Sequence, residues 1–130
     1  MRRLSFLFVL LLVSGAWAAL PPRSPEQLVD DSSDVVVGTV VEVKSWTERV
    51  KFGNDLYSTA LVRIETVEKG KLKPGVLIET HYRQTGSRSK GWAGPQGQNE
   101  ALTKGTRARV YLEKQDGMYK LLEPNGWSAP

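Results

Sequence analysis

Four residues between positions 83 and 92 have the side chains that a site for an acidic ligand needs: Arg83, Arg88, Lys90 and Trp92. Guanidinium and ammonium groups attract anions, and an indole ring offers an apolar face with one polar N–H. A cationic rim around an exposed aromatic ring can hold an acidic sugar, a phosphate-bearing polymer or a protein segment. We predict these four residues as the ligand-binding set. The alternative is that Trp92 only packs its loop onto the domain, as large aromatic side chains often do.

This chain has few side chains that are typical of catalytic sites. His81 is the single histidine and there is no cysteine, so thiol catalysis and sites built on a histidine pair or on thiolates are excluded. The acid pairs Asp30–Asp31 and Glu65–Glu68 lack the contrasting environments that separate the pKa values of catalytic carboxylates. We therefore predict no catalytic residue, no metal ligand and no cofactor. An enzyme would instead bring His81 to a carboxylate within a pocket.

The N-terminus has the order of a secretory signal peptide. Arg2 and Arg3 precede an apolar run over residues 4–13, and Ala16-Trp17-Ala18 supplies the small residues that a signal peptidase prefers. The run is shorter than the 20 or so residues that span a bilayer. Residues 1–18 are predicted to be removed by cleavage after Ala18, with Ala19 as the second choice. A retained N-terminal anchor is the alternative; otherwise the protein is exported, to the periplasm or the medium, without a stable membrane anchor.

Net charge argues against a nucleic-acid partner. The whole chain has 18 basic and 14 acidic residues, but the predicted signal takes two arginines and no acid, which leaves a net charge of +2. Nucleic-acid binding depends on many phosphate contacts, so we expect a protein or an acidic polysaccharide as partner, with polyanion or nucleic-acid binding as a distant alternative. Residues 19–130 suit one domain with one core, and we expect a monomer.

The predicted elements are one short helix and five strands. Ser24 and Gln27 form a capping box, with Pro25 at the first helical position, before a helix over residues 25–31. Alternating apolar and β-branched residues predict strands over residues 34–45, 56–68, 76–83, 106–114 and 118–122. Residues 47–55 are interpreted as a polar hairpin loop. Residues 84–105, rich in glycine and without the spacing of a phosphate-binding loop, are interpreted as a long irregular excursion.

Periodicity also predicts which side chains face the core. The first half of strand 34–45 is expected to be buried on both faces, and Gly38 within it to mark a bulge. Either Trp46 or Trp127 could plug an end of the barrel, and both are expected to be core or staple residues and not ligand contacts. The expected inward residues are Ala60, Val62, Ile64, Ala108, Val110 and Leu112, and the expected outward residues are Arg107, Arg109, Tyr111 and Glu113.

These strands suit an all-β fold, a small five-stranded OB-like Greek-key barrel with one N-terminal helix. Residues 33–40, 62–70 and 102–112 resemble exported bacterial domains related to the netrin-like barrels and the barrels of tissue inhibitors of metalloproteinases. The resemblance covers roughly residues 26–125. It implies the OB fold and the function of a binding or inhibitory module. The members that inhibit metalloproteinases present a cysteine at the mature N-terminus, whereas this chain has no cysteine.

The sequence therefore predicts an exported, non-catalytic binding or interaction module of the cell envelope or medium. An accessory subunit or an inhibitor of a secreted enzyme belongs to the same class. The competing hypothesis is a small envelope hydrolase or a metal-dependent enzyme.

Overall fold

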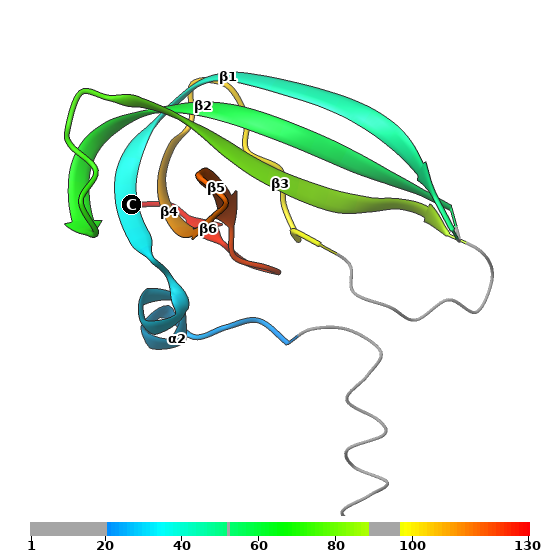
Figure 1. The fold of residues 1–130 in the computed structure, drawn as a ribbon, viewed down its shortest axis with the longest axis horizontal. Helices are drawn as coiled ribbons and strands as arrows, with labels where there is room; N and C mark the ends of the chain where they lie inside the picture. The colour runs from blue at the N-terminus through cyan, green and yellow to red at the C-terminus, as the bar shows by residue number, and fades with distance from the viewer. Residues whose placement is uncertain (1–20, 52, 89–96) are drawn as a thin grey trace, which may run out of the picture.

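The computed structural model describes residues 21–51, 53–88 and 97–130. They form a mainly β structure with one short helix, α2 (Pro25–Asp31), at the N-terminal side (Figure 1). The strands, in chain order, are β1 (Asp34–Val50), β2 (Gly53–Lys69), β3 (Leu77–Arg88), β4 (Arg107–Gln115), β5 (Met118–Leu121) and β6 (Trp127–Ser128). The helix and its capping box confirm the prediction.

Five of the strands form a near-closed ring within a six-stranded mixed sheet. The sheet order is β1-β2-β3-β5-β4-β6, and an additional pairing of β1 with β4 joins the two sides. β3 and β5 are parallel, whereas the other pairs are antiparallel. The sixth strand, β6, has two residues and pairs antiparallel with Arg109 and Val110 of β4.

The long hairpin of β1 and β2 corrects one prediction. Residues 47–55 were expected to be a loop, but the two strands stay paired up to Val50 and Gly53. β3 likewise continues to Arg88, so the first part of the expected 84–105 excursion is strand. We call the projecting parts of these strands, residues 41–50, 53–60 and 82–88, the arm; it reaches well beyond β4, β5 and β6 in Figure 1. Polar composition misled the prediction because an exposed ribbon needs few apolar residues.

The core lies inside the ring and largely matches the predicted inward positions. All six expected inward residues on β2 and β4 are at most 1 % exposed. The first half of β1 is buried on both faces, since Val35, Val36 and Val37 are all buried. The pairing of β1 with β2 shifts between Val37 and Gly38, which confirms the predicted bulge.

Tyr111 corrects another prediction. It was expected to face outward, but it is 5 % exposed and packs in a second apolar cluster with Leu28, Val35 and Leu122. Leu28 is the buried residue of α2, so the helix covers this side of β4. Within residues 21–51, 53–88 and 97–130, no helix has the length and apolar character to span a bilayer.

Two ion pairs cross the outside of the ring above β1. Arg107 Nε lies 2.7 Å from a carboxylate oxygen of Glu65, and Arg109 Nε lies 2.6 Å from one of Glu68. Each pair joins β4 to β2. They confirm that these acids are surface charges. The hydrogen bond from Arg107 is the main cause that lowers the pKa of Glu65, and the hydroxyl of Thr39 lowers it further.

We expect Arg107→Gln to raise the pKa of Glu65 back toward its ordinary value. A carboxyl whose pKa is lower in the folded than in the unfolded state stabilises the fold above its unfolded pKa, and this contribution is lost as the pH falls through its folded pKa. An NMR titration of the Glu65 side-chain carbonyl in both proteins measures the shift. An unchanged titration curve would contradict a role for Arg107; Arg63→Gln, on the same exposed surface, serves as the control.

Candidate functional site

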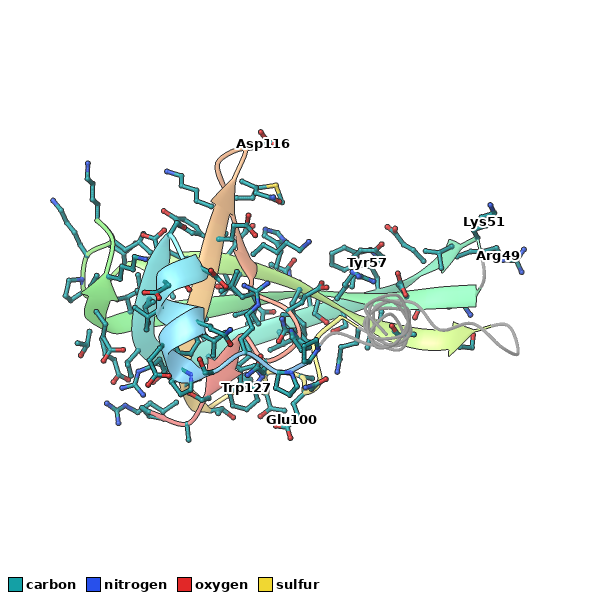
Figure 2. All side chains as sticks on the ribbon, turned by 90° about the horizontal axis from the view of Figure 1, so that it is seen from below. Arg49, Lys51, Tyr57, Glu100, Asp116 and Trp127 are labelled. Atoms are coloured by element: carbon teal, nitrogen blue, oxygen red, sulfur yellow. The ribbon has the colours of Figure 1, made fainter. Side chains whose placement is uncertain are left out.

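The candidate site is a cavity of about 260 Å³ at the base of the arm, here called the arm pocket. Strands β1, β2, β3 and β5 all contribute to its walls. In Figure 2 Tyr57 lies between the tip of the arm, marked by Arg49 and Lys51, and the β4–β5 hairpin, marked by Asp116. The lining residues are Trp46, Tyr57, Ser58, His81, Tyr82, Arg83, Met118 and Lys120.

Strand register explains how residues distant in sequence meet there. Trp46 pairs with Tyr57, and Tyr57 pairs with Arg83, so the three form a row across β1, β2 and β3. His81 lies two positions before Arg83 and pairs with Lys120 of β5. Residues two apart share a face of a strand. The row formed by Trp46, Tyr57 and Arg83 and the pair formed by His81 and Lys120 therefore present their side chains on one side of the sheet.

The aromatic wall of the pocket consists of Trp46 and Tyr57. Their ring centroids are 6.0 Å apart with planes inclined by 18°, a stacked arrangement. Trp46 Nε1 donates a hydrogen bond to Glu48 Oε1 at 3.0 Å, which orients the indole. Trp46 nevertheless remains 44 % exposed, and Met118 on the opposite wall is 52 % exposed. The expectation that Trp46 closes an end of the domain is therefore wrong.

Arg83, one of the four predicted ligand-binding residues, lines this pocket, and two carboxylates already engage it. Its guanidinium lies 3.3 Å from each carboxylate oxygen of Glu123 and 3.5 Å from Asp55 Oδ2. Both acidic side chains are largely buried, at 6 % exposure for Asp55 and 15 % for Glu123. These two carboxylates therefore largely neutralise the charge of Arg83. The main effect of Arg83 is to hold β2, β3 and the C-terminal segment together.

His81 is a hydrogen-bonded strand residue. Its Nδ1 lies 3.2 Å from Thr59 Oγ1, and its Nε2 lies 3.7 Å from a carboxylate oxygen of the exposed Glu79. The second separation exceeds the roughly 3.2 Å reach of a direct proton transfer. In the part of the chain that the structure describes, no three His, Cys, Asp or Glu side chains gather in a way that could hold a metal ion.

Lys120 supplies the available positive charge of the pocket. It is half-buried beside His81, and among the described residues it forms no ion pair. A half-buried ammonium group beside an apolar wall attracts an anion more strongly than a fully exposed one, since water screens it less. Within the described part of the chain, the pocket thus combines a flat aromatic surface with a cation that forms no ion pair.

Arg88, Lys90 and Trp92 are the other three residues of the predicted ligand-binding set. Arg88 is the last residue of β3 and pairs with Gly53 at the tip of the arm. Lys90 and Trp92 lie outside the described residues, so their predicted role stays a prediction. The chain continues at Gly97, where Gln98 is buried and bonds Leu122 O through Nε2.

Sequence reasoning missed Trp46, Tyr57, Met118 and Lys120 as candidate site residues. The signal that could have found the first two is a pair of aromatic residues on either side of a short connection, because the hairpin pairs Val50 with Gly53 and thereby places Trp46 opposite Tyr57. Met118 and Lys120 depend on the parallel pairing of β3 with β5. Local periodicity carries no information on that pairing.

Comparison of the chain with protein-family models, with curated protein sequences and with solved structures found no match in any of the three. The site is therefore interpreted from its own geometry.

Proposed function

We propose that the protein is an exported, non-catalytic binding module with an OB-like barrel, and that its ligand occupies the arm pocket. The observation that carries the proposal is the pocket itself, in which the exposed face of Trp46 borders one cavity with the ammonium group of Lys120, which has no ion-pair partner among the described residues. Concave sites with apolar walls and a few polar groups are typical of ligand binding.

The order of strand pairing supports the OB-like barrel. β1 pairs with both β2 and β4, and β3 pairs in parallel with β5, as in a five-stranded Greek-key barrel that closes on its first strand. OB folds bind oligosaccharides and oligonucleotides on the face of strands 2 and 3, between the loops that follow strands 1 and 4. Five of the residues that line the arm pocket come from β2 and β3, and one of them, Tyr57, lies between the tip of the arm and the β4–β5 hairpin (Figure 2).

The ligand class that fits best is an acidic polysaccharide. A sugar ring presents an apolar face that can stack on an exposed indole, and the uronate carboxylate of the same ring can pair with an ammonium group. Trp46 of β1 supplies the indole and Lys120 of β5 supplies the ammonium group, and both line the pocket. A nucleic acid is less suitable, since it would require a continuous track of cations for its phosphates, and Arg83 is neutralised by Asp55 and Glu123.

We expect Lys120→Gln to weaken binding of an oligogalacturonate about tenfold, because a charge-assisted hydrogen bond contributes roughly 1.5 kcal/mol. Trp46→Ala should weaken binding by a similar or larger factor through loss of the stacking surface. Isothermal titration calorimetry of the purified protein measures both effects, and the fluorescence of Trp46 should change on binding in the parent protein.

Lys104→Gln is the matched control, because Lys104 is exposed and lies outside the pocket lining. It should bind like the parent protein. Equal weakening by Lys104→Gln and Lys120→Gln would show that only net charge matters and would reject the pocket as the site. Absence of binding to uronate oligomers in the parent protein would reject the ligand class.

A further inference from the structure

Among residues 21–51, 53–88 and 97–130, nothing pairs with the outer edge of β1 along the arm. β4 pairs with β1 from Asp34 to Thr39 only, and the backbone of Val40 bonds Gly105 and Thr106. Beyond that point β1 continues through residues 41–50, paired with β2 on its other edge. In the described part of the chain, no backbone group pairs with this outer edge of residues 41–50.

Open edges of this length are ready to accept another strand. Alternate residues of an edge strand direct their N–H and C=O groups away from the sheet, and natural proteins usually block such edges with proline, bulges or a covering segment. Residues 42–50 contain no proline, and their pairing with β2 runs without a register shift from Glu42 to Val50. Considering only the residues that the structure describes, the edge is therefore regular and unpaired.

The charges along this edge are self-complementary. When the edge pairs antiparallel with a second copy of itself and Trp46 lies opposite Trp46, Lys44 of each copy lies opposite Glu48 of the other. Within one chain the two side chains are four residues apart on an extended strand, about 13 Å, too far to pair. Among the described residues neither Lys44 nor Glu48 forms an ion pair, so two new pairs would form at no cost to existing ones.

The same register extends the aromatic row. Trp46 stacks on Tyr57 of its own chain, and its partner across the edge would be the same indole in the second copy. Tyr57, Trp46, Trp46 and Tyr57 would then run across the junction on one face of the sheet, where aromatic cross-strand pairs stabilise neighbouring strands. Ser45 would lie opposite Thr47 on the other face, a pair of hydroxyl side chains suited to this contact.

We propose that the protein dimerises by antiparallel pairing of residues 42–50 of β1 with the same residues of a second copy, in the register that centres on Trp46. The dimer would replace the monomer expected from the sequence. Its twofold axis is perpendicular to the joined sheet, because antiparallel strands of identical chains are related in that way. Both arm pockets therefore lie on the same face of the joined sheet and flank the axis.

A cysteine scan tests the register directly, since the chain has no cysteine of its own. At the axis, the two Cα atoms of position 46 are about 4.5–5.5 Å apart, within the range that a disulfide bridges. The purified Trp46→Cys protein should form a covalent dimer under mild oxidation. Lys44→Cys and Glu48→Cys should each form little disulfide-linked dimer alone, yet the two proteins mixed together should form a disulfide with one another. Equal crosslinking at all three positions would reject the register.

Charge reversal tests the dimer without removing Trp46. Sedimentation velocity should show self-association of the parent protein, weakened about tenfold by Lys44→Glu or by Glu48→Lys, because each places like charges opposite one another twice. The double variant should recover the parent's dimerisation. A parent protein that is monomeric at every accessible concentration, or a dimer that is insensitive to all three variants, would overturn the proposal. Circular dichroism verifies that each variant is folded.

Discussion

The Gly38→Ala variant is expected to lose about 3 kcal/mol of unfolding free energy, or roughly 12 °C in Tm. Gly38 lies where β1 is paired on both edges, with Ile64 of β2 on one side and Ala108 of β4 on the other. An added Cβ atom would overlap the backbone oxygen of Arg63 and lie 2.8 Å from Cγ1 of Val62. Backbone atoms cannot move aside as the end of a flexible side chain can, so β1 and β2 must separate within the ring.

Thermal and urea unfolding of the purified protein measure this loss. Gly75→Ala provides the control, because Gly75 has a φ of 85° and its added Cβ atom meets nothing within 4 Å. The Gly75→Ala variant should lose only about 1–2 kcal/mol of unfolding free energy, which is the cost of a left-handed backbone conformation. A Gly38→Ala protein more stable than Gly75→Ala would show that the bulge adapts to a side chain, and the close approach of β1 to β2 would not be required for the ring.

The bulge at Gly38 also shows what local sequence can predict. A single glycine within a run of valines indicated an irregular strand, and the alternation along β2 and β4 identified six core residues that are all buried. The capping box at Ser24 located α2 because its two hydrogen bonds depend only on neighbouring residues. These features need no knowledge of strand pairing.

The arm was beyond this kind of reasoning. Polar residues 47–55 have the composition of a loop, but residues 47–50 pair with β2, and Gly53 and Asp55 of β2 also pair with β3 on their other edge. Tyr111 was placed outward by alternation, but α2 packs over that face and buries it. Both errors have the same physical origin, namely that burial of an outer face depends on which distant segment covers it.

The arm pocket was unpredictable for a related reason. Its walls come from four strands, and the parallel pairing of β3 with β5 brings Lys120 beside His81. Arg83 was identified from its charge, yet charge alone could not show that Asp55 and Glu123 face it. A cation in a sequence has the same appearance whether it meets a ligand or a buried acid of its own chain.

Replacement of Arg83 by methionine is expected to destabilise the protein by about 3 kcal/mol, because breaking a buried ion pair leaves the remaining charge without compensation. Glu123 receives contacts from Arg83 at both carboxylate oxygens, and one of those oxygens is buried. Methionine keeps the length and apolar stem of the side chain but supplies no positive charge. The free energy of unfolding of Arg83→Lys should lie between those of Arg83→Met and the parent protein. An ammonium group keeps the charge but cannot bridge Glu123 and Asp55 in the same fork geometry.

Urea unfolding of the three proteins tests this role, and Arg49→Met is the matched control. Arg49 is exposed near the tip of the arm (Figure 2), so the same substitution should change stability by no more than about 0.5 kcal/mol there. If Arg83→Met were as stable as Arg49→Met but lost affinity for an acidic oligosaccharide, Arg83 would be a ligand-binding residue as the sequence predicted. If instead stability falls as expected and Arg83→Lys retains affinity when folded, Arg83 acts by positioning β3 against the C-terminal segment, and Lys120 is left as the cation that meets the ligand.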